Sequence, residues 1–513
     1  MLKIRLVSGF LTVGAWTMAS RVLGFLRDIL IAALLGAGPV AEAFLVAFSL
    51  PNMFRRFFAE GAFNMAFVPM FSKRLEAGED AQGFAQDAFA GLGTLLIVFT
   101  ALAMAAMPWL VLAMASGFRG DERFDLAVVY GRIAFPYILF ISLAALLSGI
   151  LNATGRFVAA AAAPVLLNVL FIAAMATAHW AGWPVGDALV WMVPIAGIAQ
   201  LALVWAASVR AGFRLGLSRP RLTPEMRRLA IIAFPAMLAG GVVQVNLLVG
   251  RQVASFFDGA IAWLSYADRL YQLPLGVVGI AIGVVLLPDL SRRLRAEDIE
   301  GSREALNRAA EISLAFTLPA AVALVVIPLP LVSVLFERGA FDTADARATA
   351  LAVAVYGAGL PAFVLQKVLQ PLFFAREDTK TPFRYAVWAL VVNAGVAIAF
   401  APLLGYIAAA LGTTAAGWAM AVLLWRGSRG FGEAAAVDPQ FRHRMPRVLV
   451  ASLVMGGVAW LLALGLAPWI AGGPERYAAL AILIAGAIVA YGACARICGA
   501  FTLAELRASL RRG

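Results

Sequence analysis

Apolar runs long enough to cross a lipid bilayer recur along the whole chain, and they limit the folds that it can adopt. A spanning helix needs about 20 mostly apolar residues. On this rule the sequence predicts an all-α polytopic membrane protein with about 14 transmembrane helices. We expect these helices at residues 9–35, 43–71, 86–114, 127–151, 158–180, 188–209, 229–257, 260–289, 311–336, 347–374, 383–403, 405–425, 447–468 and 477–499.

The composition leaves little mass outside the membrane. Of the 513 residues, 63% are hydrophobic and 14% are charged, whereas charged residues make up about 25% of a typical soluble domain. Basic cytoplasmic loops explain the formal net charge of +12, because such loops carry an excess of lysine and arginine. No basic stripe interleaved with aromatic residues lies on a soluble segment, so we expect no nucleic-acid partner.

Lysine and arginine are distributed unevenly between the two sets of loops. The termini and the loops after even-numbered helices hold about 28 of them, against about 5 in the odd-numbered loops. This bias predicts that both termini are cytoplasmic. Lys3 and Arg5 precede an apolar run, as in a signal peptide. That run is too long and contains Arg21 and Arg27, so we interpret it as the first spanning helix.

The two halves of the chain share short patterns in the same order. VPMFSKRL at 68–75 matches LPDLSRRL at 287–294, and residues 107–118 resemble residues 328–341. One spacing also recurs in two pairs of residues: Pro136 with Asn168, and Pro361 with Asn393. A parallel repeat of six helices explains the common offset of roughly 220 residues. Chance similarity among apolar segments is the alternative.

The repeat predicts two six-helix lobes and two extra C-terminal helices. We expect an N-lobe at 1–209, a basic cytoplasmic inter-lobe loop at 210–228, a C-lobe at 229–425, the extra helices at 447–499 and an amphipathic C-terminal tail at 500–513. In transporters built from such repeats, the substrate site lies between the repeats near the middle of the membrane.

Ionisable residues interrupt the first two apolar segments. They are Arg21, Arg27, Asp28, Glu42, Arg55, Arg56 and Glu60. A charge at the bilayer centre costs at least about 2.5–3.5 kcal/mol on insertion scales, so such residues normally face a water-filled cavity or a partner. We expect the rest of the chain to build a cavity around these charges.

In the first helix, Arg21, Gly24 and Asp28 follow one another at i, i+3 and i+7, which places them on one stripe. Gly24 leaves space beside the charges, and Arg27 adjoins Asp28. The stripe is interpreted as the wall of a cationic cavity, because the arginines outnumber the acid. A buried structural ion pair is the alternative.

In the second helix, Pro51 should kink or break the helix, because proline cannot donate a backbone hydrogen bond. Arg55, Arg56 and Glu60 follow, and the last two form an i, i+4 pair. Alternatively, these arginines snorkel to a nearby membrane interface. Glu42 follows a GAG turn and is either a gate residue or a solvated helix end.

The eighth helix carries Asp268 next to Arg269 in an apolar run. Adjacent residues cannot share a helix face, and we expect Arg269 to point at the cavity, with Arg251 as a weaker candidate. Arginine is always charged, and its planar fork binds phosphate with two hydrogen bonds. Arginines from both lobes therefore suit a pyrophosphate or another anionic head group. A proton relay would use mostly Asp, Glu or His.

The sequence offers no catalytic or metal centre. It contains no G-x-x-x-x-G-K-[ST] motif and no H-E-x-x-H motif. His179 and His443 are isolated, and Cys494 and Cys498 lie one helical turn apart without further ligands. A membrane-embedded enzyme would need carboxylates or histidines at a membrane face, and the short loops offer few. We expect a protein that is not an enzyme and needs no cofactor or metal.

Several motifs together resemble one family. They are SRVLGFLRD, the GAG turn, AEAFLVAFSLPNMFRRFFAEGAFNMAFVP, and YADRL followed by LPLGVVGIAIGVVLLP. They are similar to the MurJ (MviN) family of lipid II flippases, in the multidrug/oligosaccharidyl-lipid/polysaccharide exporter superfamily. The resemblance implies fourteen helices in two lobes around a central cationic cavity. It implies transport of the undecaprenyl-pyrophosphate-linked peptidoglycan precursor from the cytoplasmic to the periplasmic leaflet of the bacterial inner membrane, by alternating access.

The resemblance also implies roles for individual residues. The family's cavity arginines fall on Arg21, Arg27 and Arg269, with Asp28 beside them, and the extra helices at 447–499 are expected to form a groove for the polyprenyl tail. The full set of expected substrate-binding residues is Arg21, Arg27, Asp28, Arg55, Arg56, Glu60 and Arg269, and the candidate gate residues are Glu42, Gly24 and Asp268. Glu42 stands where the family pattern has Asp.

The expected partners are lipid II, membrane lipids and the cell-wall synthesis machinery. The alternative function is a flippase for another polyprenyl-linked sugar of the same superfamily. A drug exporter of that superfamily is disfavoured, because it should carry acidic rather than arginine-rich cavity residues.

Overall fold

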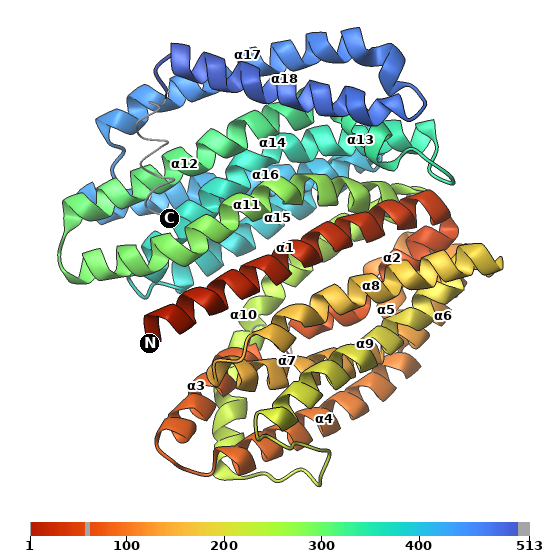
Figure 1. The fold of residues 1–513 in the computed structure, drawn as a ribbon, viewed down its shortest axis with the longest axis vertical. Coiled ribbons are helices and arrows are strands. Elements are labelled where there is room, and N and C mark those ends of the chain that lie inside the picture. The colour runs from red at the N-terminus through yellow and green to blue at the C-terminus, as the bar shows by residue number, and fades with distance from the viewer. Residues whose placement is uncertain (1, 57–61, 501–513) are drawn as a thin grey trace. The chain divides into compact units, whose positions relative to one another are not determined.

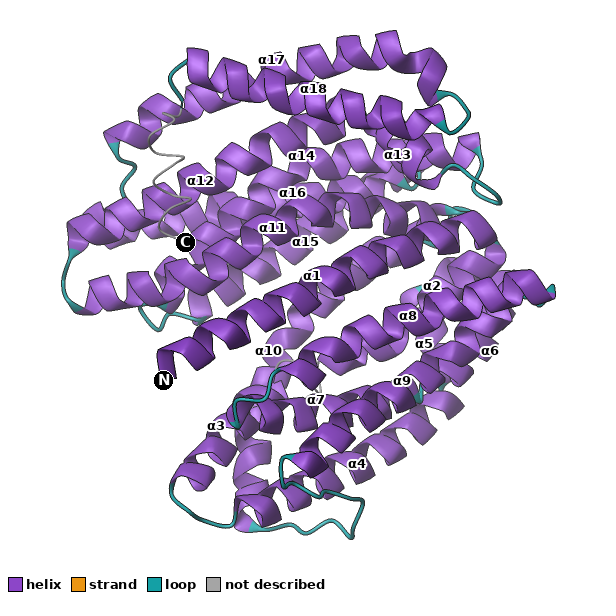
Figure 2. Cartoon of the chain, viewed as in Figure 1, coloured by secondary structure: helices purple, strands orange, loops and turns teal. Residues whose placement is uncertain are grey.

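The computed structural model describes residues 2–56 and 62–500, and helices account for most of them (Figures 1 and 2). Within these ranges the only β pairing is one isolated antiparallel bridge between Arg338 and Phe341. The prediction of an all-α protein is confirmed. The expected tail at 500–513 lies, apart from Ala500, outside the described residues.

Contacts between residues divide the chain into two units, Met1–Ala262 and Trp263–Gly513. The helices of the first unit are α1 (Leu2–Leu35), α2 (Pro39–Arg55), α3 (Ala62–Glu76), α4 (Ala81–Ala105), α5 (Met107–Met114), the 3₁₀ helix η2 (Ser116–Phe118), α6 (Glu122–Ala134), α7 (Tyr137–Ala153), α8 (Val158–Ala181), α9 (Val185–Arg210) and α10 (Pro224–Ala254).

The second unit contains nearly all of α11 (Ala260–Arg295), whose first residues belong to the first unit. The remaining helices are α12 (Ile299–Val326), α13 (Pro328–Phe336), α14 (Thr343–Phe374), α15 (Lys380–Leu404), α16 (Ile407–Ser428), the 3₁₀ helix η3 (Arg429–Ala435), α17 (Pro439–Ile470) and α18 (Glu475–Ile497).

Every expected spanning segment falls on one helix or on two consecutive helices. Among the described residues, 10 helical segments are long and apolar enough to cross a membrane. The chain is therefore a multi-pass membrane protein, while the exact number of spans stays a prediction. The lobe boundaries stay predictions too.

Several segments expected as one helix are divided. Residues 86–114 form α4 and α5, which meet at Ala106, and residues 311–336 form α12 and α13, which meet at Ile327. Prolines explain both breaks, because proline is favoured in the first turn of a new helix and disfavoured inside one. Pro51, expected to kink or break its helix, does not break it, because α2 continues through it to Arg55.

Within the first unit, α1 packs along α8, and α2 packs along α6 (Figure 1). These contacts place Arg27 and Asp28 of α1 against α8, and the start of α2 against the start of α6. Within the second unit, α12 lies between α14 and α17, and α17 runs beside α18 (Figure 1). The extra C-terminal helices are thus attached to the second unit through α12.

Candidate functional site

Arg27 and Asp28 form a buried ion pair in α1. Both residues are less than a tenth exposed, at 8% and 7%. Nη2 and Nε of Arg27 donate to Oδ1 of Asp28 over 2.7 and 3.0 Å. The guanidinium carbon also lies 6.0 Å from the ring centre of Phe48 and 5.8 Å from that of Phe171. The aromatic rings and the carboxylate together shield this charge from water.

Asn168 of α8 completes the surroundings of Arg27. Its side-chain oxygen accepts a 2.9 Å hydrogen bond from Nη1 of Arg27. Its amide nitrogen donates to the backbone oxygen of Ser20 over 3.0 Å. The sequence had marked Asn168 only through its spacing in the repeat. A lone asparagine in an apolar helix is itself a signal for a polar partner.

The predicted stripe of α1 therefore has two environments. Arg21 is exposed, whereas Arg27 and Asp28 are buried against α8. For Arg27 the structure has the buried ion pair that the sequence left open as an alternative to a cavity wall. Gly24 faces Asn168, since a Cβ atom added there would lie 3.5 Å from Nδ2 of Asn168.

The charges at the end of α2 lie on its last turn. Arg55 is half-buried and Arg56 is exposed, while Glu60 lies outside the described residues. The expected pairing of Arg56 with Glu60 is untested. The structure leaves Arg56 accessible.

Glu42 lies in the first turn of α2 and is 1% exposed, so it is not a solvated helix end. Its Oε2 accepts a 2.9 Å hydrogen bond from Nη1 of Arg123 in α6. Its Oε1 accepts a 2.9 Å hydrogen bond from the backbone N–H of Ile261, in the first turn of α11. One buried carboxylate thus joins α2, α6 and the start of α11.

Arg123 binds two further carboxylates. Its Nε lies 2.5 Å from Oδ2 of Asp121, and its Nη2 lies 2.8 Å from Oδ1 of Asp258. Its guanidinium carbon lies 4.6 Å from the ring centre of Phe118. Burial alone would raise the pKa of Asp121, but the hydrogen bonds and charge of Arg123 outweigh it and lower that pKa. We call these four residues, Glu42, Asp121, Arg123 and Asp258, the Arg123 cluster.

Sequence reasoning counted Arg123 only as a loop charge. Its partner Glu42 lies 81 positions earlier in the chain. Proximity of this kind cannot be read from local periodicity. The side chain of Asp258 is 92% exposed while it pairs with Arg123.

In the second unit, Asp268 is half-buried and Arg269 is exposed on α11. Gln272 lies one turn after Asp268 on the same helix, and its amide donates to the Asp268 carboxylate. Tyr266 is buried between the rings of Phe336 and Phe341, at centre-to-centre distances of 5.6 and 5.5 Å. Packing of Tyr266 thus fixes the rotation of α11, which leaves Arg269 on an accessible face. Its convergence with the arginines of α1 stays a prediction.

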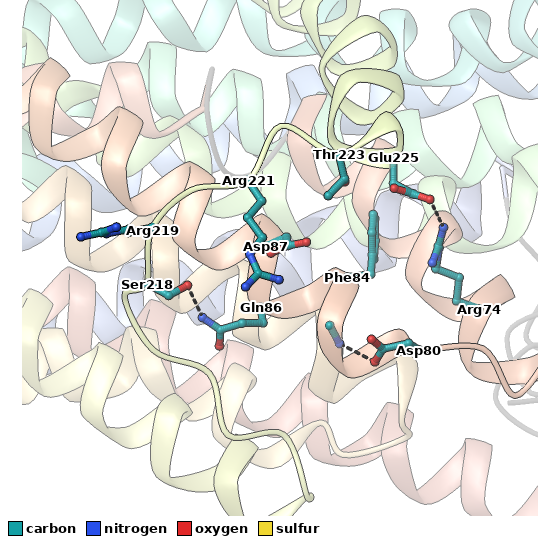
Figure 3. A pocket seen from close by; sticks show the side chains of 11 residues that line it. Arg74, Asp80, Phe84, Gln86, Asp87, Ser218, Arg219, Arg221, Thr223 and Glu225 are labelled. Carbon is teal, nitrogen blue, oxygen red and sulfur yellow. Dashed lines mark hydrogen bonds and ion pairs between the residues drawn. The ribbon is translucent and has the colours of Figure 1, made fainter.

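A polar pocket of about 460 Å³ lies where the 210–223 segment crosses the start of α4 (Figure 3). Gln86 of α4 holds this segment, because its amide donates to the Gly216 backbone oxygen and accepts from the Gly216 N–H. Arg74 pairs with Glu225 over 3.2 Å. The pKa of Glu225 is lowered mainly by hydrogen bonds from its own backbone N–H and from the Thr223 side chain, and less by Arg74. Figure 3 shows Arg221 pointing into the pocket toward Asp87. Opposite charges face each other here, so we interpret the pocket as a contact that holds the 210–223 segment to α4.

No group of three or more His, Cys, Asp or Glu side chains arranged for a metal ion was found in the part of the chain that the structure describes. The thiols of Cys494 and Cys498 lie 3.9 Å apart, one turn apart on α18.

A many-helix membrane protein with charged side chains buried at mid-helix has the character of a transporter. The fold matches that of a solved multidrug resistance MATE family transporter of the MOP superfamily in its inward-facing conformation. That match has a TM-score of 0.68, covers 83% of this chain and 98% of the other, and is only 15% identical in sequence, so it establishes the fold alone.

The family itself follows from closer matches. The family model described as lipid II flippase MurJ matches residues 31–486. A probable lipid II flippase MurJ of Rhizobium meliloti is 45% identical, over 99% of this chain and 97% of its own length. A lipid II flippase MurJ of Burkholderia cenocepacia is 36% identical, over 89% and 90%. The chain belongs to the MurJ family of lipid II flippases.

A solved structure supports this membership. A lipid II flippase MurJ in an inward closed conformation matches with a TM-score of 0.80 and 25% sequence identity, over 94% of this chain and 98% of the other. The predicted family is confirmed.

Proposed function

We propose that this chain carries lipid II from the cytoplasmic to the periplasmic leaflet of the bacterial inner membrane, by alternating access. The observation that carries the proposal is the match to the lipid II flippase family over residues 31–486. The function is transport for peptidoglycan biosynthesis, and no chemical reaction is catalysed. Both termini lie in the cytoplasm in this proposal, and the support for it is the distribution of basic residues.

The substrate head group is bound by arginines. Arg21, Arg56 and Arg269 are exposed, and guanidinium groups bind pyrophosphate oxygens through paired, charge-assisted hydrogen bonds. Arg27 also binds the head group, once its ion pair with Asp28 is replaced by one with the substrate. Support for this exchange is the buried ion pair of Arg27 with Asp28, since that carboxylate occupies the place that a phosphate oxygen would take. Arg55 and Glu60 are assigned to the same site by motif alone.

The Arg123 cluster is the periplasmic gate. Glu42 holds the first turn of α11 through Ile261, and Arg123 fixes Glu42. Release of this clamp frees the start of α11 from α2. Gly24 and Asp268 keep their predicted gate roles, Gly24 because it gives Asn168 access to α1.

Two further assignments complete the proposal. The tail of the lipid lies along α17 and α18, whose surface carries large exposed apolar side chains such as Leu453, Leu461 and Ile488. The two lobes at 1–209 and 229–425 move relative to each other around the substrate. The cell-wall synthesis machinery supplies and consumes the lipid.

The test measures lipid II on the outer leaflet in cells depleted of the endogenous flippase. The wild-type chain should restore exposure, whereas Arg27→Ala and Arg269→Ala should insert normally and fail. Asn393→Ala in α15 is the control, because it removes a buried polar side chain from an apolar helix. Lipid II that stays on the inner leaflet with the wild-type chain present would favour another polyprenyl-linked sugar as substrate.

A further inference from the structure

Asn168 holds α1 at two places with one side chain. Its oxygen accepts from Nη1 of Arg27 over 2.9 Å, and its nitrogen donates to the backbone oxygen of Ser20 over 3.0 Å. Ser20 and Arg27 lie two helical turns apart, and Gly24 lies between them. Asn168 is 5% exposed, so both bonds are shielded from water.

All three guanidinium nitrogens of Arg27 are engaged. Nε and Nη2 donate to Asp28, and Nη1 donates to Asn168. A phosphate that binds arginine with two parallel hydrogen bonds needs two adjacent N–H groups directed at it. These bonds use three of the five guanidinium N–H groups, and Arg27 is only 8% exposed. Arg27 therefore has to loosen its contacts with Asp28 or Asn168 to present two adjacent N–H groups to an anion. The strength of these two contacts sets how readily Arg27 is released.

We propose that Asn168 is a positioning residue, which sets the balance between the paired state of Arg27 and its state bound to an anionic head group. The inference rests on the proposed function of this site. An amide accepts from the guanidinium without bringing a second negative charge. Arg27 is thereby held in place, yet only one carboxylate competes with the phosphate. A second carboxylate at position 168 would keep Arg27 in the paired state.

A double-mutant cycle tests this role. Dissociation constants for lipid II are measured for the wild type, Asn168→Ala, Arg27→Gln and the double variant, in the purified full chain. A hydrogen bond to a charged group corresponds to about a tenfold or larger change in an equilibrium constant. We expect Asn168→Ala to tighten binding by about this factor, and to change nothing in the Arg27→Gln background. The same change in both backgrounds would overturn the inference.

A second readout needs no lipid. The rate at which phenylglyoxal modifies Arg27 is measured by peptide mass spectrometry. Modification should be faster in Asn168→Ala, slower in Asn168→Asp, and unchanged in the control Asn393→Ala. Equal rates in the wild type and both Asn168 variants would overturn the positioning role. A wild type that binds no lipid II, but shows the expected order of rates, would instead contradict the proposed function.

Discussion

Replacing Arg123 by methionine removes the guanidinium of the Arg123 cluster and keeps an apolar stem against Phe118. The Glu42 carboxylate then stays buried, at 1% side-chain exposure, with only the backbone N–H groups of Ile261 and Gly259 identified as donors to it. Removing one partner of a buried ion pair costs about 3–5 kcal/mol, because the other charge is left uncompensated. We expect the free energy of unfolding to fall by this amount.

The other carboxylates of the cluster contribute far less. The side chains of Asp121 and Asp258 are 33% and 92% exposed, and exposed ion pairs contribute about 0–1 kcal/mol. Asp258→Asn is therefore the matched control, with an expected loss below about 1 kcal/mol. Glu42→Gln should cost less than Arg123→Met, because Asp121 and Asp258 still compensate Arg123.

Reversible unfolding of the purified protein in mixed micelles gives these free energies. The double variant Glu42→Gln with Arg123→Met should be more stable than Arg123→Met alone, because no buried charge remains without a partner. If Arg123→Met costs as little as Asp258→Asn, or if the double variant is less stable than both single variants, the clamp reasoning is refuted.

Four further predictions concern three other sites and Asp121 of the Arg123 cluster. Gly24→Ala should bind lipid II like the wild type, because the added Cβ meets Asn168 at an ordinary 3.5 Å, whereas Gly24→Leu should displace Asn168 and speed the labelling of Arg27. Gly456→Val should separate α17 from α12, because even a Cβ there would lie 2.5 Å from Cγ1 of Val322; we expect a loss of about 1–3 kcal/mol in unfolding experiments. Asn307→Ala should raise hydrogen exchange in residues 429–438, because its amide donates to Ala436 and its oxygen accepts from the Asp438 N–H; unchanged exchange there would contradict this. The lowered pKa of Asp121 predicts stability that is complete above its unfolded pKa of about 3.8 and is lost as the pH falls through the folded value; Asp121→Asn should remove that dependence in acid unfolding curves.

Much of the fold could be predicted because each helix that crosses the bilayer needs about 20 mostly apolar residues, and such a run is visible in the sequence. The expected segments 158–180 and 188–209 coincide with α8 and α9 to within a few residues. The breaks at Ala106 and Ile327 were missed, although Pro108 and Pro328 signal them. A continuous apolar run hides such breaks, because hydropathy does not depend on whether the backbone is interrupted.

The site could be predicted only in part. Charges within an apolar helix identified Arg27, Asp28 and Glu42 without their distant partners. Arg123 and Asn168 became partners only through the packing of α6 on α2 and of α8 on α1. Pairs separated by 81 and 141 positions leave no periodic signal in one sequence.

The most direct test of lipid II transport through the arginine site uses purified protein in sealed vesicles. Lipid II placed on one leaflet is followed by its accessibility to a reagent that cannot cross the membrane, with Arg27→Ala and the control Asn393→Ala in parallel. The account predicts that the wild type and the control move lipid II between leaflets, whereas Arg27→Ala does so at least about tenfold more slowly. Transport by Arg27→Ala at the wild-type rate, or no transport by the folded wild type, would contradict it.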